Sequence, residues 1–169
     1  MNKHSWHLVE GYRPGILGTC VRMHADFYAR HAGFGAFFEA QVAAGMADFV
    51  QRLDRPSNGI WSACAGDRML GCVVLDGEDL GGDAGHLRWF IVDDGARGAG
   101  IGSALLGAAL SFADARGFDR VELWTFAGLD AARRLYEGVG FDLVDEQPGR
   151  RWGGEVVEQH FVRHRLVSA

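Results

Sequence analysis

The chain has 169 residues, of which 48% are hydrophobic and 23% are charged. These values suffice for one domain with a continuous core and differ from those of disordered chains. The formal net charge of -5 is opposite in sign to the basic excess of proteins that bind nucleic acid through their surface, so no nucleic-acid partner is expected.

The sequence also predicts neither membrane insertion nor export. No run of eighteen apolar residues occurs, and residues 1–12 lack the apolar segment of a signal peptide. The three cysteines, Cys20, Cys64 and Cys72, are widely spaced and form no CxxC pair, which indicates reduced thiols. His160 and His164 lie four apart in an extended segment, a spacing that does not chelate a metal. We therefore expect a cytoplasmic protein with no membrane partner and no metal.

The first half of the chain predicts two helices among antiparallel strands. The expected elements are a strand at 6–12, helices at 16–31 and 34–53, and strands at 60–65 and 69–75. Apolar residues recur at helical spacing in both helical segments. Gly33 closes the first helix, and Gly66-Asp67 is a favourable hairpin turn.

The second half predicts a strand–helix–strand–helix–strand unit. After a glycine- and aspartate-rich loop at 76–85, the expected elements are a strand at 87–92, a helix ending at 116, a strand at 120–124, a helix at 129–137, and strands at 141–145 and 155–167. Residues 150–152 predict a turn. Antiparallel strands followed by this unit predict an α+β sandwich with a mixed sheet and no internal domain boundary.

The most informative segment is the glycine-rich loop at 97–103, between the strand at 87–92 and the next helix. Gly98, Gly100 and Gly102 let the backbone turn tightly and approach a ligand closely. The helix that follows directs unpaired N–H groups and its positive dipole end at the same place, which favours a phosphate or pyrophosphate. Arg97 could add a charge-assisted contact.

Two nucleotide-binding motifs do not fit this loop. A P-loop ends in Gly-Lys-Ser/Thr, whereas this loop ends in Gly-Ile-Gly-Ser. The dinucleotide fingerprint Gly-x-Gly-x-x-Gly would need a glycine where Ser103 stands, or at Leu105 if it began at Gly100. The remaining interpretation is a loop that binds acyl coenzyme A.

Two motifs in this chain resemble those of the GNAT superfamily of N-acetyltransferases. Arg97-x-x-Gly100-x-Gly102 matches the family's Gln/Arg-x-x-Gly-x-Gly/Ala signature, and Ala132-x-x-x-Tyr136-x-x-x-Gly140-Phe141 resembles its second motif. The two occur in the family's order. The resemblance implies the GNAT fold, a mixed and mostly antiparallel sheet of about seven strands flanked by about four helices, in one domain covering residues 1–169.

Two further segments resemble one subgroup of this family. Residues 24–34 and Gln159-His160-Phe161 are similar to acetyltransferase domains that are fused to MarR-like DNA-binding domains in bacterial regulators. No such DNA-binding half is present in this sequence, so we do not carry a role in transcription over.

The resemblance implies acetyl-CoA as co-substrate and a set of residues that bind it. The backbone of Phe90, Ile91 and Val92 is expected to hydrogen-bond the pantetheine arm and to help polarise the thioester carbonyl. The pyrophosphate is expected on the N–H groups of Arg97, Gly98, Ala99, Gly100, Ile101, Gly102 and Ser103. Ala132 and Arg133 are also assigned to coenzyme A, as is Thr125, which stands near the position where many relatives have an asparagine.

The same resemblance assigns the acid to Tyr136, while the base stays open. The phenol would protonate the departing thiolate, although Tyr136 could instead be a tyrosine of the core. We take Glu122 as the candidate catalytic base, although it could instead face solvent or pair with an arginine. Asp93, His24 and a chain of water molecules are the alternatives.

The first helix suggests an acceptor pocket. His24 and Tyr28 are four residues apart on its apolar stripe, where polar groups need partners. Either they form internal hydrogen bonds or they line the pocket that binds the substrate. Phe34, Phe38 and Trp89 could supply aromatic walls.

These observations predict an N-acetyltransferase that moves the acetyl group of acetyl-CoA directly to a primary amine in a ternary complex. The acceptor is a small molecule, or alternatively an amine of a protein. No cysteine is placed to form an acyl-enzyme. The alternatives are a non-catalytic acyl-CoA sensor and an acyltransferase for another acyl-CoA, for which Arg88 is the nearby cation. The last strand could mediate a homodimer.

Overall fold

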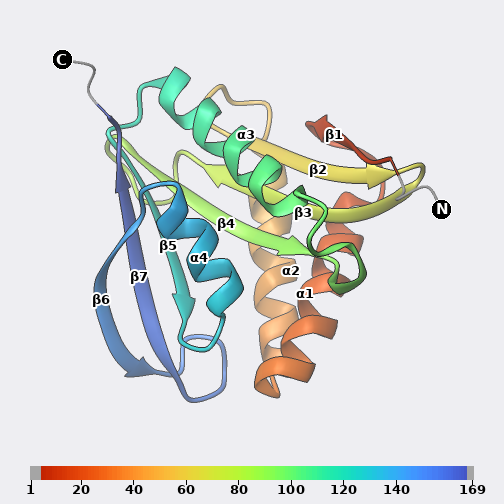
Figure 1. Ribbon diagram of the computed structural model, residues 1–169, viewed down its shortest axis with the longest axis vertical. Coiled ribbons are helices and arrows are strands. Elements are labelled where there is room, and N and C mark those ends of the chain that lie inside the picture. The colour runs from red at the N-terminus through yellow and green to blue at the C-terminus, as the bar shows by residue number, and fades with distance from the viewer. Residues whose placement is uncertain (1–4, 167–169) are drawn as a thin grey trace.

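A twisted sheet forms the centre of this protein, and helices cover both of its faces (Figure 1). The computed structural model describes residues 5–166. Its elements in chain order are β1 (His7–Glu10), α1 (Ile16–Ala32), α2 (Ala36–Val50), β2 (Gly59–Ala65), β3 (Arg68–Asp76), β4 (Ala84–Val92), a 3-10 turn η1 (Asp94–Ala96), α3 (Ile101–Arg116), β5 (Arg120–Phe126), α4 (Asp130–Gly138), β6 (Asp142–Gly149) and β7 (Val156–His164).

The seven strands are arranged in the order β1-β2-β3-β4-β5-β7-β6. All neighbouring pairs are antiparallel except β4 and β5, which are parallel and are joined through α3. The predicted α+β fold, with a mostly antiparallel sheet of seven strands and four helices, is confirmed. The prediction of one domain over 1–169 extends beyond the described residues and stays a prediction. The expected end of the last strand at 167 also lies outside the described residues.

Some predicted boundaries were wrong because strand pairing decides them. Both ends of the predicted loop at 76–85 belong to strands, since Asp76 pairs with His86, and Ala84 pairs with Arg120. The β6 strand continues past the predicted end at 145 to Gly149 and includes Pro148. Proline is tolerated there because β6 is at the edge of the sheet. Among residues 5–166, no helix has the length and apolarity needed to cross a membrane.

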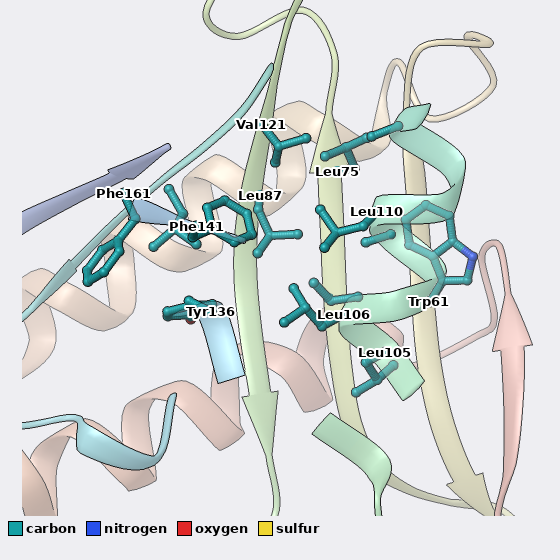
Figure 2. Close-up of a cluster of buried hydrophobic side chains, with 14 of the residues drawn as sticks. Trp61, Leu75, Leu87, Leu105, Leu106, Leu110, Val121, Tyr136, Phe141 and Phe161 are labelled. Carbon is teal, nitrogen blue, oxygen red and sulfur yellow. The ribbon is translucent and has the colours of Figure 1, made fainter. Parts of the chain in front are cut away.

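Two hydrophobic cores lie on opposite sides of the sheet. Helices α3 and α4 cover one face, where Leu105, Leu106 and Leu110 of α3 pack against the strands (Figure 2). Helices α1 and α2 cover the other face, with Phe38, Met46 and Phe49 in its core. The sheet is therefore buried on both faces along β3, where apolar residues run without alternation.

The two central strands β4 and β5 pair only at their beginnings. Their register covers Ala84–His86 against Arg120–Glu122 and then stops, and Figure 1 shows the strands diverging beyond this point. An irregularity accompanies the divergence, because Val74 of β3 pairs with Arg88 whereas Cys72 pairs with Ile91. Trp89 and Phe90 therefore stand opposite one residue of β3, which is a β-bulge. Trp89 adopts φ 47°, the only positive φ outside glycine in the described chain.

The core under α3 can be tested by shortening one side chain. Leu106 is fully buried, so Leu106→Ala should lower the free energy of unfolding by about 2–5 kcal/mol through lost transfer energy and a residual cavity. Urea denaturation monitored by circular dichroism measures this difference. Ser111→Ala, on the exposed side of the same helix, should change stability by less than about 0.5 kcal/mol. Equal effects of the two variants would contradict the packing described above.

Candidate active site

The N-terminus of α3 presents a row of unpaired N–H groups. Gly98 and Gly100 adopt φ of 80° and 78°, and Gly100 precedes the helix without any side-chain cap. Within residues 5–166, no hydrogen bond involves the backbone N–H groups of positions 98–103 as donors. Open donors at a helix N-terminus favour an anionic group.

A cavity of about 640 Å³ lies against this loop, and we call it the α3 cavity. Ten of the residues assigned to coenzyme A from the sequence line it: Phe90, Ile91, Val92, Arg97, Gly98, Gly100, Ile101, Gly102, Ser103 and Ala132. The strand end, the glycine loop and the start of α4 therefore contribute to one concave surface.

Three residues assigned to coenzyme A lie outside the α3 cavity. Arg133 directs its Nε to Glu137 at 2.8 Å, while Arg134, one position further round α4, lines the cavity instead. Thr125 lines a second cavity. Ala99 does not line the cavity, and its carbonyl accepts a hydrogen bond from Trp6 Nε1 at 3.2 Å. The motif located the segment, but helix rotation and strand orientation decide which side chains face the space.

Arg97 is a positioned cation at the edge of the α3 cavity. Its Nε lies 2.9 Å from Asp94 Oδ1, and its guanidinium lies 5.1 Å from the ring centre of Phe27. Both contacts limit its rotamers, so its remaining N–H groups stay beside the open backbone donors of the loop.

A second cavity, of about 420 Å³, lies between the sheet and α1 and α2, and we call it the α1–α2 cavity. It is lined by His24, Tyr28, Phe38, Gln41, Val42, Asp79, His86, Leu87, Arg88, Trp89, Phe90, Leu123, Trp124, Thr125, Phe126, Tyr136, Arg151 and Trp152. Tyr28 and Phe90 line both cavities. The two spaces thus meet where β4 and β5 have diverged.

The β-bulge decides which residues of β4 face the α1–α2 cavity. Leu87 and Phe90 pack with the core under α3, whereas Trp89 and Ile91 pack with the core under α1 and α2. Arg88 lies on the same side as Trp89, with its guanidinium 4.1 Å from the centre of the indole. Without the extra residue, strict alternation would place Arg88 and Trp89 on opposite faces.

Tyr136 of α4 lies near the junction of the cavities. Its ring packs against Phe90, Phe141 and Phe161 at centroid distances of 6.0, 5.9 and 6.0 Å, and Figure 2 shows it beside the last two. The side chain lines the α1–α2 cavity, and within residues 5–166 its hydroxyl forms no hydrogen bond. Burial raises the pKa of Tyr136 well above its usual value. The phenol therefore stays protonated and can serve as a donor.

His24 presents an acceptor to the same cavity. Only 4% of the residue is exposed, and its Nδ1 lies 2.8 Å from the carbonyl oxygen of Cys20. A carbonyl only accepts, so Nδ1 carries the proton and Nε2 keeps its lone pair. Burial lowers the pKa of His24 to about 4, although the Cys20 carbonyl acts in the opposite direction. The imidazole is therefore neutral near pH 7.

The aromatic residues expected at the acceptor pocket have two different positions. Tyr28, Phe38 and Trp89 line the α1–α2 cavity. Phe34 does not; its ring lies 6.1 Å from that of Tyr28 and 5.4 Å from that of Phe126, and so supports the wall from behind. Burial raises the pKa of Tyr28 to about 12, with Arg97 acting against this shift.

Glu122 lies outside both cavities, so the geometry gives no direct support to its assignment as the candidate base. Its carboxylate accepts hydrogen bonds from Arg120 Nε at 2.6 Å and from His160 Nε2 at 2.7 Å. Burial acts to raise the pKa of Glu122, but these two bonds outweigh it and hold the pKa below its usual value. Asp93 also lies outside, since it bonds Gly95 N and Arg68.

Several residues that line the α1–α2 cavity were missed by sequence reasoning. Arg151 and Trp152 come from the connection of β6 to β7, which the sequence predicted only as a turn, and Gln41 of α2 donates to the Arg151 carbonyl at 3.2 Å. Asp79 comes from the connection between β3 and β4, and His86 from the last position at which β4 pairs with β5. No spacing in the sequence links these segments, because they meet only through the tertiary structure.

Comparison with known proteins identifies the family. The sequence profile of the acetyltransferase (GNAT) family matches residues 23–141. The chain belongs to the GNAT family. The profile runs from within α1 to just past α4, so it contains both motifs and every lining residue of the two cavities except Arg151 and Trp152.

Individual relatives agree with the family and with the fold. An N-acetylaspartate synthetase from Xenopus tropicalis is 31% identical over 125 residues, which are 73% of this chain and 42% of the synthetase. The chain spans less than two thirds of the length of the curated relatives it matches. A ribosomal-protein-alanine N-acetyltransferase from Brucella melitensis superposes with a TM-score of 0.74 at 15% identity, over 94% of this chain and 99% of that one.

The α3 cavity has the donors that a GNAT co-substrate requires. The open N–H groups of 98–103 and the guanidinium groups of Arg97 and Arg134 fit a pyrophosphate and its charge. The diverged edge of β4, at Ile91 and Val92, lies in the same cavity and fits the amides of a pantetheine arm. The residues present therefore fit acetyl-CoA.

The backbone of Gly100 provides a test of this cavity. A β-branched residue is strained at φ 78° by about 1–2 kcal/mol, and relief of the strain turns the N–H groups away. Gly100→Val should therefore weaken acetyl-CoA binding at least about tenfold in isothermal titration. Gly107→Ala, in the middle of α3 with free space around it, should bind as the unmodified protein does. Unchanged affinity of Gly100→Val would contradict the assignment of the loop.

Burial of neutral His24 predicts a pH dependence of stability. The unfolded chain takes up a proton near pH 6.5, whereas the folded chain does so only near pH 4, so the free energy of unfolding falls as pH drops between these values. His24→Gln should remove about 2 kcal/mol of the loss between pH 7.5 and pH 5. Urea denaturation at both pH values measures it. His164→Gln, on the exposed end of β7, should leave the loss unchanged; the same loss in His24→Gln would contradict a neutral, buried imidazole.

Proposed function

We propose that this domain transfers the acetyl group of acetyl-CoA to a primary amine, with both substrates bound at once. Acetyl-CoA occupies the α3 cavity and the amine occupies the α1–α2 cavity. The observation that carries the proposal is the meeting of the two cavities at Tyr28 and Phe90. A similar structure supports it: a streptothricin acetyltransferase from Bacillus anthracis, with a TM-score of 0.59 at 20% identity over 70% of this chain and 68% of that one, is a complex with acetyl coenzyme A.

Tyr136 is the proposed general acid. Bound acetyl-CoA supplies the acetyl thioester, and Tyr136 holds a proton on Oη beside the junction of the cavities. The raised pKa of Tyr136 keeps this proton in place across the physiological range. An aromatic enclosure of Phe90, Phe141 and Phe161 fixes the ring while leaving the hydroxyl without a competing partner.

His24 takes the place that Glu122 had in the sequence-based hypothesis. His24 lines the cavity proposed for the amine, with its ring centre 6.1 Å from that of Tyr28, and its Nε2 keeps a lone pair because Nδ1 bonds the Cys20 carbonyl. With a pKa of about 4, the imidazole cannot draw a proton from a free ammonium ion, but it can accept a hydrogen bond from an uncharged amine. It can then take a proton once the attacking nitrogen has become strongly acidic.

The other candidate functions have less support. A non-catalytic sensor would not need a donor and an acceptor at the junction of two cavities. A charged acyl group would have to extend through the junction to reach Arg88, which lines the α1–α2 cavity and not the α3 cavity. The likeness to MarR-fused domains and the homodimer through the last strand stay predictions. We also propose a cytoplasmic location, because the three cysteines are free and buried.

One substitution separates the proposed catalytic role of the Tyr136 hydroxyl from the structural role of its ring. Tyr136→Phe keeps the ring contacts and removes only the hydroxyl, so acetyl-CoA affinity should be unchanged while kcat falls by about a hundredfold or more. Thiol release with an accepted amine measures kcat. Glu122→Gln is the comparison variant and should keep kcat within about threefold, because Glu122 lies outside both cavities. A kcat that survives in Tyr136→Phe would remove the proposed acid.

A further inference from the structure

The α1–α2 cavity combines aromatic walls with two arginines. Its aromatic lining is Tyr28, Phe38, Trp89, Phe90, Trp124, Phe126, Tyr136 and Trp152. Arg88 and Arg151 line the same space from different elements, β4 and the connection between β6 and β7. An aromatic enclosure accommodates an apolar body, and guanidinium groups in its wall are partly withdrawn from water, with side-chain exposures of 23% for Arg88 and 43% for Arg151.

Arg151 is held in place with its terminal nitrogens open. Its guanidinium lies 5.4 Å from the ring centre of Trp124 and 5.8 Å from that of Trp152. Its backbone N–H donates to Glu158 Oε1 at 2.8 Å, and its carbonyl oxygen accepts a hydrogen bond from Gln41 Nε2. Its Nε lies 3.5 Å from Glu158, and within residues 5–166 no acceptor bonds Nη1 or Nη2. The free edge of this guanidinium matches a carboxylate.

Arg88 is a second, more deeply held cation. It is 23% exposed, and its Nη1 lies 3.3 Å from Asp76 Oδ2 and 3.7 Å from Asp79 Oδ1. Its stacking on Trp89 depends on Gly45 of α2, because a Cβ there would lie 2.8 Å from the indole and 3.3 Å from Arg88 Nη2. Along β4 it stands two positions before Phe90, where the cavities meet, and the β-bulge lies between them.

Each arginine of the cavity has a carboxylate partner, and each keeps guanidinium N–H groups that no acceptor within residues 5–166 bonds. Asp79 lies 2.6 Å from His86 Nδ1 and also faces Arg88. Burial lowers the pKa of His86, although its bond to Asp79 acts in the opposite direction, so His86 adds no positive charge near pH 7. Asp76 and Asp79 beside Arg88, and Glu158 beside Arg151, offset much of the charge of the two arginines. What favours an anion is the open edge of Arg151, whose Nη1 and Nη2 are bonded by no acceptor within residues 5–166.

We propose that the acceptor is an α-amino acid with an apolar or aromatic side chain. This inference rests on the proposed function and names its substrate class. The amine lies at the junction beside Tyr28 and Phe90, the carboxylate pairs with the arginines, and the side chain fills the aromatic enclosure. An α-amino acid carries its amine and carboxylate on one carbon atom, which fits a junction residue and an arginine only two positions apart on β4.

The test compares substrates that differ only in the carboxylate. Purified full-length protein is first titrated with acetyl-CoA and is then assayed by thiol release with L-phenylalanine, L-phenylalaninamide and phenethylamine. We expect kcat/KM for L-phenylalanine to exceed that for both others at least tenfold. The amide is the critical control, because its amine is less basic than that of the acid. A preference for the acid therefore cannot come from a larger fraction of uncharged amine.

Variants of Arg151 test whether the preference for a substrate with a carboxylate comes from this arginine. Arg151→Gln should raise KM for L-phenylalanine at least tenfold and leave kcat/KM for phenethylamine unchanged, and Arg151→Lys should restore part of the loss. Arg150→Gln is the matched control, since the neighbouring Arg150 pairs with Glu155 and does not line the cavity. A purely structural role of Arg151 would affect all three compounds equally and would overturn the inference.

The outcomes separate the inference from the proposed function. Acetyl-CoA binding with acetylation of phenethylamine or the amide, but not of the acid, overturns the inference and leaves the proposed function intact. Acetyl-CoA binding with no turnover of the acid, and no change in tryptophan fluorescence when the acid is added with coenzyme A, also overturns it. Absence of acetyl-CoA binding contradicts the proposed function itself.

Discussion

The structure depends on the early end of hydrogen bonding between β4 and β5. These strands pair over three positions and then separate, with a β-bulge at Trp89 and Phe90 on the separating strand. The separation opens the sheet itself, so a space on the α3 side connects with one on the α1–α2 side. Had the ladder continued, hydrogen bonds and side chains would fill this passage, and the two cavities would be isolated.

Burial at this opening shifts the pKa values of the two groups proposed for proton transfer, Tyr136 and His24, in opposite directions. Removal from water disfavours the charged form of each, so the pKa of Tyr136 rises and that of His24 falls to about 4. Both are therefore uncharged near pH 7, one as a donor and one as an acceptor. Apolar packing on each side of the sheet thus contributes to the chemistry as well as to stability.

Charge in the α1–α2 cavity is organised by a buried carboxylate. Asp76 is fully buried and accepts from Arg52 at 2.7 and 2.9 Å and from Arg88 at 3.3 Å. It holds one arginine in structural ion pairs and the other at the cavity wall. Arg151 reaches the cavity by a different route, supported by aromatic rings instead of a buried acid. The two arginines that line the acceptor cavity are therefore positioned by independent sets of contacts.

The sequence by itself determined the local features: the helix ends at Gly33 and at residue 116, the open N–H groups after Arg97, and the family. These depend on backbone conformation and on contacts within a few residues, which spacing reveals. Only the tertiary structure decided that Arg134 lines the α3 cavity in place of Arg133, and that Glu122 is occupied by Arg120 and His160. Helix rotation, strand register and the pairing of distant segments determine such positions, because they arise from contacts between residues far apart in the chain.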